Sequence, residues 1–283
     1  MTKQDPGGII SAEHDILISE KDYKMELRNQ IEAIAIEAGK IMLSADSIKA
    51  ATDEKSGHAN FVTKYDKKVQ EFLFAELARV LPEASFVGEE EGAESFREEY
   101  RNGYAFVIDP IDGTTNFIKA YRPSVTSIGL LLDGKPFIGV VYNPYQKVMY
   151  SAERGKGSYR NGIRIHSSEE PLARSIFSMG TAPYYEELTA RSFKIAEKYL
   201  HRTIDMRRSG TAAWDLCLLA TGITGLYYEL KLGLWDFTAG AVIAEEAGCV
   251  LTDIDGNPLT YDGPSSVLAV SSGVARENYL PEA

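Results

Sequence analysis

The segment best equipped for chemistry is Asp109-Pro-Ile-Asp-Gly-Thr-Thr-Asn116. The apolar run at 104–108 predicts a strand that delivers Asp109 to its end, and Asp112 follows three positions on. Two carboxylates at the end of one strand can share a hard cation, which prefers oxygen ligands. Gly113 predicts a tight turn that opens a helix, whose free N–H groups would bind phosphate. The alternative interpretation is structural: the aspartates form an Asx turn and a helix cap, and bond only backbone amides.

Two known motifs do not fit this segment. An EF-hand loop needs oxygen ligands at its third and fifth positions and Gly at the sixth, where this chain has Ile111, Gly113 and Thr114. The haloacid dehalogenase signature DxDGT has one residue fewer between its aspartates, and no GDxxxD-type loop follows downstream. A nucleophilic aspartate therefore stays only as an alternative interpretation.

Other acidic residues stand at the ends of predicted elements. Glu89 and Glu90 follow a short apolar run, and Glu229 ends another. Asp236 begins an apolar helix, for which the structural interpretation is an ordinary cap. Each of these signals is weak alone, because Glu clusters are usually solvated loops. Together with the first segment they predict an oxygen-only site assembled from three separated parts of the chain.

Composition excludes several classes of function. The net charge of −11 and a pI of about 5.0, without a basic run, exclude nucleic acid as a partner. Cys217 and Cys249 fit buried apolar positions, which predicts a reducing compartment, and scattered histidines exclude a zinc site. Neither a secretory signal nor a membrane-spanning apolar run is present. These features predict a soluble cytoplasmic protein with no membrane partner.

Hydrophobic periodicity predicts the elements that position these residues. Helices are expected near residues 25–45, 66–81, 185–200, 211–221 and 236–247, with a loop at 52–60. Strands are expected near residues 104–109, 125–132, 136–142, 147–152, 175–178, 203–207 and 226–230, with two more closing the chain. The order predicts a layered α/β sandwich, divided into a flexible leader (1–21), an N-terminal α+β subdomain (22–165) and a C-terminal α/β subdomain (166–283).

The motifs jointly resemble those of the inositol monophosphatase family. GEE, DPIDGTTNF, SGTAA, YYE and WDxxAGxxIxxEAG occur in that family's order and approximate spacing, from about Met25 to Ser271. The resemblance implies an αβαβα sandwich of the inositol monophosphatase and fructose-1,6-bisphosphatase type. It also implies a homodimer, inhibition by lithium, and two or three Mg²⁺ ions per site.

The resemblance further implies roles for matching residues. The first metal would be held by Glu89, Asp109 and the carbonyl of Ile111, the second by Asp109, Asp112 and Asp236, and a third, weaker ion by Glu89 through water. Catalytic roles fall to Glu89, Thr114 and Asp112, with Thr114 and Glu89 orienting the attacking water. Substrate contacts fall to Gly113 and Thr114 for the phosphate, and to Gly210, Thr211, Ala212 and Glu229 for the alcohol. Supporting positions behind the first metal fall to Lys55, Asp66 and Glu90.

The implied reaction is Mg²⁺-dependent hydrolysis of a small phosphate monoester, inositol 1-phosphate first. Two cations about 3.5–4 Å apart can flank one phosphate, activating water on one side and neutralising the leaving alkoxide on the other. Alternative substrates are fructose 1,6-bisphosphate, 3′-phosphoadenosine 5′-phosphate, histidinol phosphate and NADP. Lys119 and Arg122 depart from the common family pattern and bear on the pocket rim. A hypothesis of another class is a non-catalytic, metal-binding regulatory protein.

Overall fold

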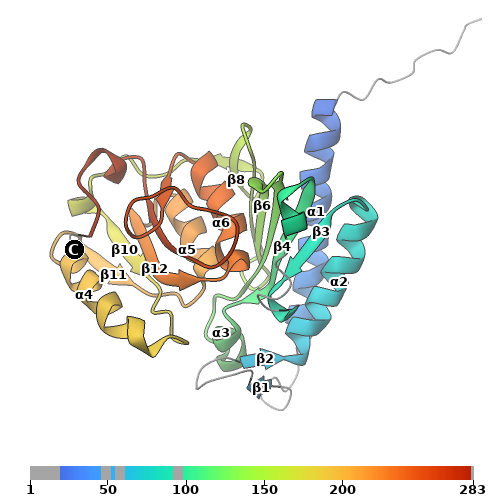
Figure 1. Cartoon of the computed structure of the whole chain (residues 1–283), viewed down its shortest axis with the longest axis horizontal. Helices are drawn as coiled ribbons and strands as arrows, with labels where there is room; N and C mark the ends of the chain where they lie inside the picture. The colour runs from blue at the N-terminus through green and yellow to red at the C-terminus, as the bar shows by residue number, and fades with distance from the viewer. Residues whose placement is uncertain (1–19, 46–51, 55–60, 92–97, 282–283) are drawn as a thin grey trace, which may run out of the picture.

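Five alternating layers of helix and sheet make up the protein in a computed structural model that describes residues 20–45, 52–54, 61–91 and 98–281. Across Figure 1, α1 and α2 cover a seven-stranded sheet, α5 and α6 fill the middle, and α4 covers a five-stranded sheet. The predicted αβαβα sandwich is therefore confirmed. Within the described residues, no helix has both the length and the apolar composition that crossing a bilayer requires.

The predicted helices all form, with shifted ends. They are α1 (Glu20–Leu43), α2 (Lys64–Val80), α3 (Thr114–Lys119), α4 (Thr189–Leu200), α5 (Ala212–Ala220) and α6 (Leu234–Glu246). Helix α2 begins early because Thr63 and Asp66 form a capping box that satisfies the first N–H groups. Helix α1 includes Glu20 and Lys21, so the predicted leader is wrong for these two residues, and residues 1–19 lie outside the described part.

The seven-stranded sheet carries the first acidic residues. Its strands, in spatial order, are β3 (Ser85–Gly88), β4 (Tyr104–Asp112), β5 (Val125–Leu132), β6 (Lys135–Asn143), β7 (Val148–Glu153), β8 (Gly157–Arg160) and β9 (Ile163–Ile165). Only the β3–β4 pair is parallel. Asp133 and Gly134 connect β5 to β6 as a hairpin, and both residues have positive φ, as a type I′ turn requires. Strand β4 runs on past Asp109, and its pairing with β5 shifts register before Asp112.

The five-stranded sheet has the spatial order β11 (Asp205–Arg207), β10 (Ile176–Met179), β12 (Leu226–Leu232), β14 (Ser265–Val270) and β13 (Val250–Thr252). Strand β12 pairs with β14 across a bulge after Glu229. The expected end of this strand at residue 230 is therefore wrong, because Leu230 and Leu232 are both buried in the strand and α6 begins at Leu234.

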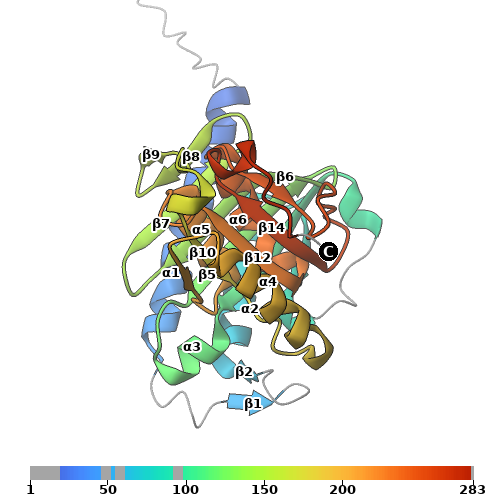
Figure 2. The ribbon, with the colours of Figure 1, turned by 90° about the vertical axis from the view of Figure 1, so that its left-hand side faces the viewer.

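Two further expectations concern segment boundaries. The predicted loop at 52–60 is wrong at β1 (Thr52–Glu54), which pairs antiparallel with β2 (Phe61–Thr63), and residues 55–60 lie outside the described part. Figure 2 shows the β1–β2 pair beside α3 at one end of the molecule. The sheets change between β9 and β10, but α6 contacts the first sheet extensively, and the subdomain division near residue 165 stays a prediction.

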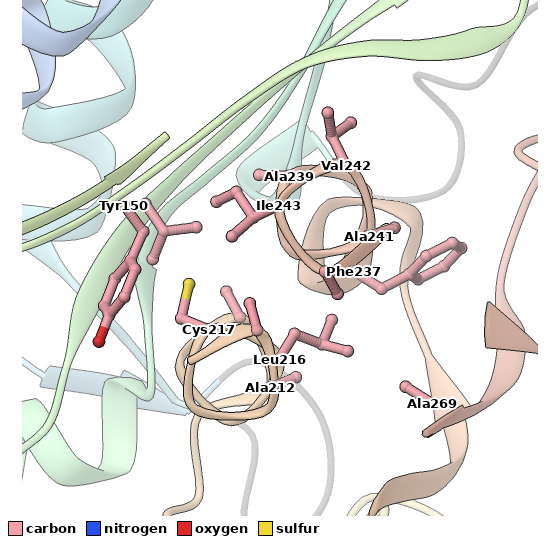
Figure 3. Packing of buried hydrophobic residues seen from close by; sticks show 14 of the residues in the cluster. Tyr150, Ala212, Leu216, Cys217, Phe237, Ala239, Ala241, Val242, Ile243 and Ala269 are labelled. Carbon is pink, nitrogen blue, oxygen red and sulfur yellow. The ribbon is translucent and has the colours of Figure 1, made fainter. Parts of the chain in front are cut away.

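The middle layer contains the largest core cluster (Figure 3). Leu216 of α5 and Phe237 and Ile243 of α6 are fully buried there, while Tyr150 of β7 meets Trp214 edge-on at 5.6 Å between ring centroids. Both cysteines are free thiols buried in this region. Because α6 is apolar on every side, it fits only between two sheets, and this burial fixes the position of its N-terminus.

Helix α6 approaches β6 so closely that a side chain at Gly139 would disturb it. An added Cβ would lie 2.3 Å from the Ala239 carbonyl oxygen. We expect Gly139→Ala to lower the free energy of unfolding by about 1–3 kcal/mol through overpacking. Gly263→Ala, where nothing lies within 4 Å, is the control and should be near neutral. Urea denaturation of both variants measures this, and equal stability would contradict the close packing.

Candidate active site

Strand β4 ends in two buried carboxylates. Asp109 and Asp112 are 3% and 8% exposed, and they stand on either side of the register shift. The Ile111 N–H donates to Asp109 Oδ1 at 3.0 Å, and the Ala213 N–H donates to Asp112 Oδ2 at 2.7 Å. The Asp109 bond is the Asx turn of the structural interpretation, whereas the Asp112 bond joins β4 to α5. Each bond uses one oxygen, so each carboxylate has a second oxygen that no described backbone group holds.

The third carboxylate comes from the C-terminal half of the chain. Asp236 lies in the first turn of α6 and accepts the Gly233 N–H at 2.6 Å, which is the helix cap expected from the sequence. In addition to burial, the charge of Asp236 raises the pKa of Asp109, and the charge of Asp112 raises the pKa of Asp236. Asp236 therefore serves as a cap with one oxygen and faces the acidic residues of β4.

The electrostatic state of these aspartates is unusual. Burial raises the pKa of Asp109, Asp112 and Asp236 well above the ordinary carboxyl range, and repulsion by neighbouring carboxylates, including that of Glu89, adds to the effect. No ion pair within the described part of the chain includes any of the three. Buried carboxylates without a counter-charge favour protonation or a bound cation.

The donor chemistry fits a hard divalent ion. All candidate ligands are oxygens, namely the carboxylates and the Ile111 carbonyl, a set that suits Mg²⁺ and not zinc. As they stand, the described acidic, histidine and cysteine side chains form no group of three ready to hold an ion. Each aspartate accepts one backbone N–H through one oxygen, which leaves its other oxygen without a backbone donor among the described residues.

A second acidic group lies behind Thr114. Burial raises the pKa of Asp66 to about 7; hydrogen bonds from Thr63 oppose this shift, and the charges of Glu89 and Glu90 contribute to it. The Thr114 hydroxyl lies 3.2 Å from the Ile111 carbonyl oxygen and 3.4 Å from Asp66 Oδ1. Thr114 therefore connects the cap of α2 to the end of β4. The expected supporting residue Lys55 lies outside the described residues.

The segment Gly113-Thr114, for which phosphate binding is predicted and which is called the phosphate loop below, contacts the residues that precede α5. Gly113 has φ of 88°, a left-handed conformation that favours glycine, and an added Cβ would meet Thr211 Oγ1 at 2.4 Å. The Asn116 amide donates to the Ser209 carbonyl at 2.9 Å and to Thr211 Oγ1 at 3.1 Å. Gly210, with φ of 80°, and Ala212 belong to the same segment. The structure thus brings the two predicted substrate segments into direct contact.

Glu229 lies on β12 with both oxygens engaged. Its Oε1 accepts the Ala182 N–H at 2.8 Å and its Oε2 accepts the Tyr227 hydroxyl at 2.9 Å. Burial raises its pKa, which the nearby Arg208 partly opposes. No ion pair of the described residues joins Glu229 to Lys231, and the Lys231 ammonium instead lies 5.9 Å from the Tyr185 ring centroid.

Sequence reasoning missed several residues of this region. The side chain of Tyr184 is 55% exposed, but desolvation of its hydroxyl and the charges of Glu89, Asp236, Asp109 and Asp112 raise its pKa, which places the hydroxyl near the acidic site. Nothing in the sequence around Tyr184 signals this. Asp215 is buried in α5, and burial raises its pKa to about 7. A charged residue inside an otherwise apolar helix was a signal for it. Ser209, which precedes GTAA, contacts Asp215.

Comparison with known proteins places this site in a family. The sequence matches the model of the inositol monophosphatase family over residues 24–283. Inositol monophosphatase 1 of Homo sapiens is 32% identical over 265 residues, 92% of this chain and 95% of that protein. The structure of inositol monophosphatase from Anabaena aligns with a TM-score of 0.76 at 30% identity, over 88% of this chain and 92% of that chain. SaIMPase-II with bound inositol monophosphate aligns with a TM-score of 0.74 at 27% identity, over 90% and 94%.

The comparisons thus identify the five-layer chain as a phosphoric monoester hydrolase. Two sheets enclose the central helices in this chain as they do in solved inositol monophosphatases. The chain belongs to the inositol monophosphatase family.

The raised pKa values predict a characteristic pH dependence of stability. Asp66 and Asp215, with an ordinary value of 3.8 and a folded value of about 7, stabilise the fold fully below their unfolded pKa. That contribution is lost as pH rises through about 7. We therefore expect the Tm of chelator-treated protein to fall between about pH 5 and about pH 8.

Divalent cations should reverse that fall. Since ligands must be deprotonated, Mg²⁺ should raise Tm by several degrees near pH 8 and much less near pH 5. Thermal unfolding with EDTA and with Mg²⁺ at both pH values measures this, and Asp109→Asn should reduce the Mg²⁺ effect. An equal Mg²⁺ shift at both pH values would contradict an acidic metal site.

Proposed function

We propose that this chain is a Mg²⁺-dependent phosphatase that hydrolyses a small phosphate monoester, with inositol 1-phosphate as the favoured substrate. The observation that carries the proposal is the convergence of the buried Asp109 and Asp112 and the half-buried Asp236 beside Gly113-Thr114, none of them with a counter-charge among the described residues. Glu89, Asp109 and the Ile111 carbonyl would hold one ion, and Asp109, Asp112 and Asp236 the other. Bound Mg²⁺ supplies Lewis-acid stabilisation of the negative charge on the phosphate.

The chain's own residues supply positioning. The N–H groups of Gly113 and Thr114 would bind phosphate oxygens, because they open α3 without intrahelical partners. The Thr114 hydroxyl, held near Asp66 and the Ile111 carbonyl, would orient the attacking water together with Glu89. Burial of the aspartates keeps competing water away from the reacting phosphate.

The alcohol part of the substrate would lie against Gly210, Thr211, Ala212 and Glu229. A polyol is favoured because the buried Glu229 carboxylate can accept hydrogen bonds from hydroxyl groups. SaIMPase-II also has a structure with bound 2′AMP, 28% identical to this chain, so nucleotides stay alternatives beside fructose 1,6-bisphosphate and histidinol phosphate. A non-catalytic regulatory role is disfavoured by the complete set of carboxylates. We further propose, from the family, a cytoplasmic homodimer.

Phosphate release from a panel of these monoesters, with Mg²⁺ and with EDTA, tests the proposal. We expect Mg²⁺-dependent release, fastest with inositol 1-phosphate. Absence of release from every ester would favour the regulatory alternative. A trapped phospho-aspartate at Asp109 or Asp112 would instead support a nucleophilic aspartate.

Asp109 is the proposed ligand shared by both ions, so Asp109→Asn should remove nearly all turnover. The amide keeps the size of the side chain and its bond to the Ile111 N–H, and removal of a buried charge should leave the fold intact. Steady-state kinetics with circular dichroism checks both parts. Family membership also predicts inhibition by millimolar lithium. A variant with unchanged kcat and normal Mg²⁺ dependence would remove Asp109 from the metal site.

Glu229 should determine substrate preference without holding a metal. Charge-assisted hydrogen bonds contribute about 1.5–3 kcal/mol, so Glu229→Gln should lower kcat/KM for inositol 1-phosphate by roughly ten- to a hundredfold. An aryl phosphate, which lacks hydroxyls, should lose much less. Lys231→Gln, two residues on, is the matched control and should change neither substrate. Equal losses on both substrates would show that Glu229 supports the fold or the metals.

A further inference from the structure

Asp215 is a buried carboxylate to which no step of the proposed reaction assigns a role. It is 2% exposed, one turn into the apolar helix α5, and takes part in none of the ion pairs of the described residues. Burying a charge without a counter-charge is costly. A charged residue that is buried in an apolar helix without a counter-charge often marks a functional site. Asp215 also lies near Glu229, whose charge affects it.

Both ends of the segment 209–211 are bonded to Asp215. Its Oδ2 accepts the Ser209 hydroxyl at 2.7 Å, and its backbone N–H donates to the Thr211 carbonyl at 3.1 Å. Ser209 Oγ in turn accepts the Thr211 N–H at 3.1 Å. At 2.7 Å the Ser209–Asp215 bond has the length of a well-formed hydroxyl–oxygen hydrogen bond, so this link ties the segment to α5.

That segment contacts the phosphate loop and a metal-binding carboxylate. Thr211 Oγ1 lies against Gly113, and the Asn116 amide donates to the Ser209 carbonyl at 2.9 Å. Two residues after Thr211, the Ala213 N–H donates to Asp112 Oδ2 at 2.7 Å. The orientation of α5 and its preceding segment therefore sets the positions of the loop and of Asp112.

We propose that Asp215 is a positioning residue of the active site, which acts through Ser209 on the segment 209–213 and so on Gly113 and Asp112. This inference rests on the proposed function. Its remaining oxygen, Oδ1, and the Ser178 hydroxyl are both buried without a hydrogen-bond partner among the described residues. The Ser178 hydroxyl lies beside the carboxylate, and the closest hydrogen bond that Asp215 accepts is the one from Ser209. A misplacement of about 1 Å in a catalytic loop can reduce turnover by about a hundredfold.

The test compares Asp215→Ala, Asp215→Asn, Ser209→Ala and the double variant Asp215→Ala/Ser209→Ala. Asp215→Ala and Ser209→Ala should each lower kcat/KM by roughly ten- to a hundredfold, and the double variant should lose no more than the worse single one. Asp215→Asn should recover most of the activity, because its amide oxygen still accepts the Ser209 hydroxyl. Glu153→Gln is the matched control, since Glu153 is buried and bonded to Lys156, outside the active site, and it should keep wild-type kcat/KM.

Hydrogen exchange of the amides at 209–214 gives a readout that does not need turnover. Exchange should speed up in Asp215→Ala and stay near wild type in Asp215→Asn. If the wild-type protein releases no phosphate, the proposed function fails and exchange alone decides this inference. Additive losses, single variants within twofold of wild-type kcat/KM, or unchanged exchange in Asp215→Ala would overturn it.

Discussion

The desolvation of Asp109, Asp112 and Asp236, to which repulsion by neighbouring carboxylates adds, is the constraint on which the rest of the structure depends. Removing these carboxylates from water without a counter-charge opposes folding, and their raised pKa values reflect that cost. Each is held by one backbone N–H, from Ile111, Ala213 and Gly233 respectively. The burial of apolar side chains in the layers around them must therefore offset this free-energy cost, and a bound cation would offset part of it.

The layers also explain why the site forms where it does. Strand β4 belongs to the first sheet, whereas Asp236 begins α6 and Ala213 lies in α5, both between the sheets. Gly129 and Gly139 allow α6 to approach the first sheet at backbone contact. That approach places the N-terminus of α6 near the end of β4. The packing of the core therefore determines the geometry of the site, so core residues far from the phosphate loop affect that geometry.

Sequence alone predicted the parts of the site that local patterns encode. Asp109 follows an apolar run and Asp236 begins an apolar helix, so hydrophobic periodicity located both, and the sandwich followed from the order of elements. Tyr184 and Asp215 were missed because their roles depend on contacts between segments distant in the chain. The end of β12 was misplaced for a similar reason, since pairing with β14 across a bulge extends the strand to Leu232.

The proposed divalent-cation site at Asp109, Asp112 and Asp236 can be measured directly. Calorimetric titration of chelator-treated protein with Mg²⁺ near pH 7, repeated in buffers of different ionisation enthalpy, counts the protons released on binding. Because burial and mutual repulsion raise the pKa of these carboxylates, the account predicts saturable binding with net proton release, both reduced in Asp109→Asn. Binding without proton release, or no saturable binding by the wild-type protein, would contradict it.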